Sequence, residues 1–179
     1  MNYSEFLKNK EILDTPTGFD CNEFPEVLFD FQKAIVKWAL KKGKAAIFAD
    51  TGLGKTFIQL AWANEIQKYT QQKILIVAPL CVSQQTIEEA KKLNIQSVIY
   101  VRETPKALTG IFITNYEMLD HIDLTQFSGI VLDESSILKN QSGKIRTKII
   151  EKSRVVPYRL SCTATPSPND YMELASQCE

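Results

Sequence analysis

Short apolar runs rich in β-branched residues recur along the sequence, and each is followed by a stretch with helical character. The runs are AAIFA, KILIVAP, QSVIYV, GIFIT, GIVLDE and YRLSCTA. Continuous apolar strands of this kind are typical of a parallel sheet that is buried on both faces. The sequence therefore predicts an α/β fold, with a mostly parallel sheet and helices on both faces. Ligands of such open sheets bind beyond the carboxyl ends of the strands, so polar residues just after each run are the first candidates for a site.

The length of 179 residues suits one well-buried domain. Residues 1–25 contain Pro16, Gly18 and Pro25 and show no regular pattern, so we expect them to form an N-terminal extension. Residues 26–179 are expected to form the domain.

A helix is expected ahead of the first apolar run. The stretch EVLFDFQKAIVKWALKKG places Phe31, Ile35, Trp38 and Ala39 at helical spacing and closes on two lysines and Gly43. We expect an amphipathic helix that packs on the sheet through these apolar residues.

Charge and composition narrow the functional classes. Lys and Arg number 21, equal to Asp and Glu, so the chain has no bulk positive charge to hold nucleic acid by itself. The first residues do not form a signal peptide and no long apolar span occurs, so we expect a soluble cytoplasmic protein with no membrane partner. The scattered cysteines, Cys21, Cys81, Cys162 and Cys178, and the single His121 argue against zinc, disulfide and histidine-based sites.

A phosphate-binding loop follows the first run. The sequence ADTGLGKT matches the phosphate-loop pattern, except that Ala49 stands at its first glycine. Gly52 and Gly54 permit backbone turns that aim N–H groups at an anion, and Lys55 and Thr56 would contact the nucleotide phosphates and Mg²⁺. A chance match in a surface turn is the alternative. The candidate nucleotide-binding residues are Asp50, Thr51, Gly52, Leu53, Gly54, Lys55 and Thr56.

An acidic pair ends the run GIVLDE. Asp133 and Glu134 would be costly to bury together without a cation, which Mg²⁺ supplies. Asp133 would hold the ion, and Glu134 would orient and deprotonate the attacking water. Taken alone, such a pair is more often a helix cap. With Lys55 they form the predicted catalytic set.

These motifs and four others resemble the superfamily-two helicases and translocases, in particular the first RecA-like lobe of the Swi/Snf-like branch. The segments are FDFQKA, ADTGLGKT, VAPLCVSQQTIEEA, FITNYEML, LDESSILKN and LSCTATPSPNDYMELA, in the order that the family has them. The alanine at the head of the phosphate loop is common in this superfamily. The resemblance implies a P-loop NTPase of RecA-like fold that uses ATP and Mg²⁺.

The resemblance also implies roles for further residues. Gln32 would read the adenine edge with its carboxamide, although simple exposure on its helix is the alternative. Ser83, Gln84, Thr114, Asn115 and Tyr116 would face the nucleic acid, where the first two could instead be helix caps and Tyr116 could be core. Ser161 and Thr163 would couple hydrolysis to movement by hydrogen bonds toward the acidic pair. Ser136 stands where the family commonly has histidine or aspartate.

We therefore expect the ATP-binding lobe of an ATP-dependent DNA helicase or translocase. The family works with two RecA-like lobes, and no segment here resembles the second, which supplies an arginine to the γ-phosphate. A second lobe in cis or in trans is thus an expected partner, with DNA favoured and RNA possible. The isolated chain should be nearly inactive. An RNA helicase lobe and a non-helicase P-loop NTPase or nucleotide sensor remain as alternatives.

Overall fold

The computed structural model describes residues 15–95, 98–134 and 149–165. Six strands form one sheet, and every adjacent pair is parallel. They are β1 (Lys44–Phe48), β2 (Lys73–Val77), β3 (Val98–Tyr100), β4 (Gly110–Thr114), β5 (Phe127–Asp133) and β6 (Tyr158–Thr163). Their order in the sheet is β1-β6-β5-β2-β4-β3. Each strand overlaps one of the six apolar runs, so the predicted parallel α/β fold is confirmed.

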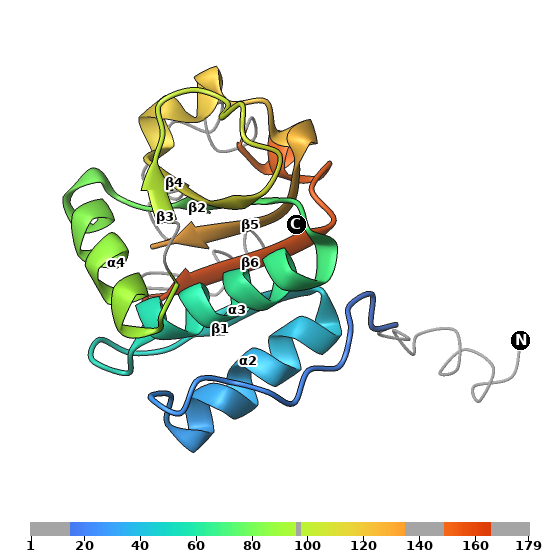
Figure 1. Cartoon of the computed structure of the whole chain (residues 1–179), viewed down its shortest axis with the longest axis vertical. Helices are drawn as coiled ribbons and strands as arrows, with labels where there is room; N and C mark the ends of the chain where they lie inside the picture. The colour runs from blue at the N-terminus through green and yellow to red at the C-terminus, as the bar shows by residue number, and fades with distance from the viewer. Residues whose placement is uncertain (1–14, 96–97, 135–148, 166–179) are drawn as a thin grey trace, which may run out of the picture.

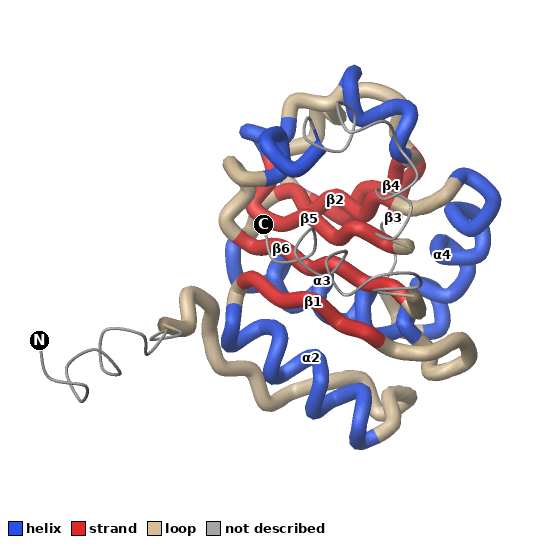
Figure 2. Tube along the Cα trace, turned by 180° about the vertical axis from the view of Figure 1, so that it is seen from behind, coloured by secondary structure: helices blue, strands red, loops and turns tan. Residues whose placement is uncertain are grey.

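Among the described residues, three α-helices cover one face of the sheet: α2 (Asp30–Lys42), α3 (Lys55–Thr70) and α4 (Leu80–Lys92). Figure 1 shows α3 crossing in front of the strands, and Figure 2 shows the strands in front of α3 from behind. Helix α3 also packs between α2 and α4, so it is buried almost all round, including Ile58, Leu60, Trp62 and Ile66. A helix enclosed in this way has no broad polar face.

The opposite face of the sheet is covered differently. Its described cover consists of two short 3-10 helices, η1 (Tyr116–His121) and η2 (Leu124–Gln126), and of helical residues 149–153. Alternate strand residues serve the two faces, as a period of two requires. Ile74 and Ile76 belong to the core under the three α-helices, whereas Leu75 and Val77 belong to the second core. Helical segments therefore lie on both faces, but the described segments on the second face are short.

No helix within the described ranges is long and apolar enough to cross a membrane.

Helix α2 forms where the sequence predicts it but buries a different stripe. Its buried side chains are Gln32, Val36, Ala39 and Leu40, whereas Phe31 and Trp38 are 45% and 47% exposed. The prediction that Phe31 and Trp38 pack on the sheet is therefore wrong. The helix carries two neighbouring apolar stripes at helical spacing, and packing against α3 and β1 selects the one through Val36.

Residues 15–25 run alongside α2 (Figure 1). The backbone N–H groups of Thr17, Gly18 and Phe19 donate to the carbonyls of Lys42, Lys41 and Leu40 at 3.1–3.2 Å. These are carbonyls of the last helical turn, which have no partner within the helix. A Cβ at Gly18 would lie 1.7 Å from the Leu40 carbonyl oxygen, so this close approach requires glycine.

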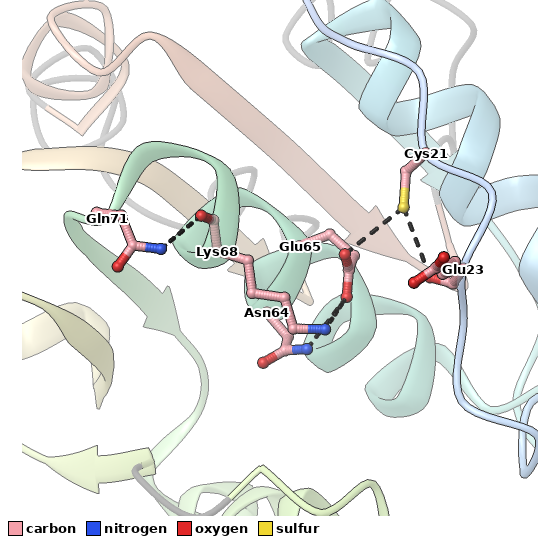
Figure 3. A network of polar contacts seen from close by, with 6 residues as sticks. All are labelled: Cys21, Glu23, Asn64, Glu65, Lys68 and Gln71. Atoms are coloured by element: carbon pink, nitrogen blue, oxygen red, sulfur yellow. Dashed lines mark hydrogen bonds and ion pairs between the residues drawn. The ribbon is translucent and has the colours of Figure 1, made fainter.

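The same segment reaches α3 through a polar network around Glu65 (Figure 3). The Glu65 side chain is buried, and its carboxylate accepts from Lys68 Nζ at 2.7 Å, Asn64 Nδ2 at 3.2 Å and Cys21 Sγ at 3.5 Å. Burial raises the pKa of the Cys21 thiol, and the nearby Glu65 charge adds to this rise. Cys21 therefore stays protonated and donates, which fixes the segment to α3 as well as to α2.

Candidate nucleotide-binding site

The sheet order brings the two main motifs together. Strands β1 and β5 both flank β6, and parallel strands place their carboxyl ends at the same edge. The phosphate loop leaves the end of β1, and the acidic pair stands at the end of β5. Helix α3, which begins at Lys55, reaches the acidic pair directly, because its Gln59 side chain donates a hydrogen bond to the Asp133 carboxylate. Residues about 80 positions apart in sequence thus meet at one site.

The phosphate loop has the backbone that its glycines allow. Gly52 and Gly54 have φ angles of 86° and 74°, in the left-handed region that favours glycine. Gly54 is the N-cap of α3, and no side chain of the described residues caps that helix. The first N–H groups of α3, together with the positive end of its dipole, are therefore available to an anion.

Charged side chains within the loop bind its own backbone. The Lys55 ammonium donates to the carbonyl oxygens of Ala49 at 3.0 Å and Asp50 at 3.2 Å. The Asp50 carboxylate accepts from the backbone N–H of Thr51 at 2.7 Å and from its hydroxyl at 3.1 Å, and these bonds lower the pKa of Asp50. The N–H of Thr51 is thereby committed inside the loop. A bound phosphate would have to replace the contacts of Lys55.

The carboxamide of Gln32 lies against the loop rather than in solvent. Gln32 is buried, its Nε2 donates to the Leu53 carbonyl at 3.1 Å, and its Oε1 accepts from the Phe29 N–H at 3.0 Å. Both ends of the amide are occupied, so reading adenine would require it to exchange these bonds. The exposed rings of Phe29 and Phe31 stack beside it, with centroids 6.0 Å apart.

The acidic pair is partly buried and held by other elements. Gln59 of α3 donates from Nε2 to Asp133 Oδ1 at 2.5 Å. The pKa of Asp133 is nevertheless raised, because burial outweighs that hydrogen bond and the Glu134 charge adds to the effect. Glu134 has a φ angle of 48°, a left-handed conformation that is uncommon for glutamate. Strained residues of this kind concentrate at functional sites.

Two contacts of this site were not predicted from the sequence. The first is Gln59, which stands one helical turn beyond Lys55, and its only sequence signal is a polar residue within an apolar helix. The second is the Tyr116 hydroxyl, which donates to the Asp133 carbonyl at 2.7 Å. Burial raises the pKa of Tyr116 well above its ordinary value, so the phenol remains a donor.

The donor chemistry fits a magnesium ion bound with a nucleotide. No cluster of three or more His, Cys, Asp or Glu occurs in the part of the chain that the structure describes, so a cage made only of protein ligands is not present there. Mg²⁺ usually binds one or two protein oxygens and takes its other ligands from water and phosphates. The Asp133 carboxylate and the Thr56 hydroxyl supply hard oxygen donors of this kind.

Most residues predicted to face nucleic acid lie inside the domain. Ser83 is buried and donates to the Pro79 carbonyl, and Thr114 is fully buried and donates to the Val101 carbonyl. Asn115 is buried and caps η1 by accepting from Met118 N. With Tyr116 bonded to Asp133, only Gln84 of this predicted set is exposed. In this conformation the side chains of the other four residues form hydrogen bonds within the domain.

The hydrogen bonds predicted between the coupling residues and the acidic pair are not formed. The Thr163 hydroxyl accepts from Thr165 N, and neither it nor Ser161 bonds Asp133 or Glu134. In β6 it is Cys162 that pairs in register with Asp133, so Ser161 and Thr163 lie on the opposite side of the strand. Ser136, Cys178 and the end of the LSCTATPSPNDYMELA segment, which contains Pro166 and Pro168, lie outside the described residues.

Comparison with known proteins identifies the class. The fold and the joined motifs are those of a RecA-like helicase domain, and residues 29–174 match the model of the DEAD/DEAH box helicase family. The chain therefore belongs to the DEAD/DEAH box helicase family. No curated protein matches the chain at a significant level.

Solved structures support the same fold. The SWI2/SNF2 ATPase core of Sulfolobus solfataricus in complex with dsDNA is 25% identical, with a TM-score of 0.71 over 89% of this chain. The UvsW helicase of bacteriophage T4 is 15% identical, with a TM-score of 0.69 over 99% of this chain. The chain spans 37% of the length of the first and 65% of the second.

Proposed function

We propose that this domain binds ATP with Mg²⁺ and is the first ATP-binding lobe of a DNA helicase or translocase. The observation that carries the proposal is the meeting of the phosphate loop and the acidic pair at one edge of a parallel sheet, in a chain of the DEAD/DEAH family. Lys55 would contact the β- and γ-phosphates, and Thr56 and Asp133 would hold Mg²⁺. Gly52, Leu53 and Gly54 would surround the phosphates with backbone.

Hydrolysis would take place between this lobe and a second one. Glu134 would accept a proton from the attacking water, and the bound metal would offset charge on the phosphates. The second lobe would supply a cation to the γ-phosphate, which is worth about a thousandfold or more in rate. We therefore expect slow hydrolysis by residues 1–179 alone. Robust turnover stimulated by nucleic acid in the absence of any partner would contradict this assignment.

DNA is the favoured nucleic acid. The matched SWI2/SNF2 ATPase core, which is 25% identical to this chain, was solved in complex with dsDNA. The exposed Gln84 lies near the start of α4, whose amino end has no side-chain cap among the described residues. Helix N-termini of this kind bind phosphate without net positive charge, which suits a chain whose charges balance.

The test is ATP turnover in a two-lobe form with dsDNA, single-stranded DNA and RNA. We expect the largest stimulation by DNA, and loss of stimulated turnover in Lys55→Ala and in Glu134→Gln. Retained turnover in Glu134→Gln would overturn the role of Glu134 as the base. Stimulation by RNA alone would make the domain part of an RNA helicase.

A further inference from the structure

Gln59 is a buried polar side chain in an otherwise apolar part of α3. It is 1% exposed, and its neighbours Ile58, Leu60 and Ala61 are also buried. Burial of a carboxamide costs free energy unless its donors and acceptor find partners. The contacts of this amide therefore indicate what it does.

The amide joins α3 to two adjacent strands. Its Nε2 donates to Asp133 Oδ1 of β5 at 2.5 Å, and the side chain lies close enough to the Cys162 thiol of β6 to affect the pKa of that thiol. Asp133 and Cys162 face each other in register across the two strands. Since Lys55 is one turn earlier on α3, the same helix holds both the phosphate-binding lysine and the partner of the carboxylate.

A neutral donor at this position has a specific effect on Asp133. It binds one carboxylate oxygen and, together with the backbone N–H of Glu134, restricts the orientation of the group. A carboxylate has about four lone-pair sites, so these two bonds leave acceptor capacity for a cation. Because Gln59 carries no charge, it does not neutralise the carboxylate as a lysine would, and the full negative charge remains for a cation. Carboxylates that bind metals are commonly oriented by hydrogen bonds of this type.

We propose that Gln59 is a positioning residue that orients the Asp133 carboxylate toward the Mg²⁺ of a bound nucleotide. This inference rests on the proposed function, since it requires a nucleotide in the phosphate loop. Gln59 does not contact the nucleotide in this proposal, so it acts only through Asp133.

The test measures ADP binding to the chain of residues 1–179 in Mg²⁺ and in EDTA, by calorimetry. The dissociation constant in EDTA divided by the dissociation constant in Mg²⁺ reports how much the metal strengthens ADP binding. Gln59→Met keeps the length of the side chain but removes the donor, and we expect the ratio to fall about tenfold. ADP affinity in EDTA should stay unchanged, because the phosphate loop itself is intact.

A matched control lies on the same helix. Gln67→Met makes the same chemical change two turns further along α3, where the amide donates to Thr109 Oγ1 at 2.7 Å near the surface. This control should leave the ratio unchanged. Gln59→Asn serves as a second variant, because its shorter amide cannot reach Asp133, and we expect the same loss. Thermal unfolding of each variant verifies that it is folded.

The outcomes separate the two proposals. If Lys55→Ala binds ADP as well as the unaltered chain, the proposed function is overturned and the role of Gln59 with it. If ADP binding depends on Lys55 but folded Gln59→Met and Gln59→Asn keep the full magnesium ratio, only the role of Gln59 is overturned. A lower ratio in both Gln59→Met and Gln59→Asn, together with an unchanged ratio in Gln67→Met, supports the positioning role of Gln59.

Discussion

The ends of β1 and β5 lie at the same edge of the sheet, separated by β6, but they are built from different parts of the chain. Beyond β1, the phosphate loop is shaped mainly by its own glycines and by backbone contacts of Lys55 and Asp50. Beyond β5, the acidic pair is held by side chains from α3 and η1. A site formed by local backbone can be recognised from a sequence motif. The contacts of a site held by side chains from distant elements become visible only in the folded structure.

The largest expected effect tests the phosphate loop. Lys55→Ala removes the ammonium that would meet the phosphates, and charge-assisted hydrogen bonds of this kind contribute about 1.5–3 kcal/mol each. We expect ADP affinity to fall about 100-fold, measured by calorimetry. Lys92→Ala, which removes an exposed cation at the end of α4, is the control and should bind normally. Equal affinities in the two variants would contradict the role of Lys55.

The second prediction compares the two glycines of the loop. A Cβ at Gly54 would lie 2.4 Å from Gln32 Nε2, whereas a Cβ at Gly52 meets nothing within 4 Å. Both have positive φ angles, which cost about 1–2 kcal/mol for alanine. We expect Gly52→Ala to lose about 1 kcal/mol of unfolding free energy and Gly54→Ala about 2–3 kcal/mol, because only the latter displaces Gln32. Denaturant unfolding measures both, and equal losses would show that the Gln32 contact contributes nothing.

The third prediction tests the side-chain support of the acidic pair. Tyr116→Phe removes the hydroxyl that donates to the Asp133 carbonyl, and a lost hydrogen bond of this type costs about 1 kcal/mol. The free energy of unfolding should fall by that amount. Tyr69→Phe is the control, since that ring is 60% exposed. If both variants unfold alike, the Tyr116 contact does not stabilise this end of β5.

The smallest effect concerns the backbone of Glu134. Its φ of 48° is unfavourable for glutamate but not for glycine, so Glu134→Gly should raise the free energy of unfolding by about 0.5 kcal/mol after the entropy cost of glycine. Glu134→Gln keeps the unfavourable angle and should leave stability unchanged. A destabilised Glu134→Gly variant would show that the side chain itself stabilises the fold.

Much of this protein follows from local sequence. The six apolar runs determine the strands, because continuous β-branched stretches bounded by turns have few other stable arrangements. Gly52, Gly54 and Lys55 determine the loop and the start of α3 by backbone geometry alone. These features need no knowledge of distant residues.

Tertiary structure decided the rest. Which stripe of α2 is buried depended on α3 and β1, so Phe31 and Trp38 are exposed while Gln32 is buried. The register of β5 and β6 set Cys162, rather than Ser161 or Thr163, beside Asp133. The burial of Thr114 and Asn115 and the contacts of Tyr116 and Gln59 with Asp133 likewise arise from packing between elements far apart in the chain. The physical reason is that a sequence pattern specifies local backbone, whereas the partner of a buried polar group is chosen by which elements the sheet brings together.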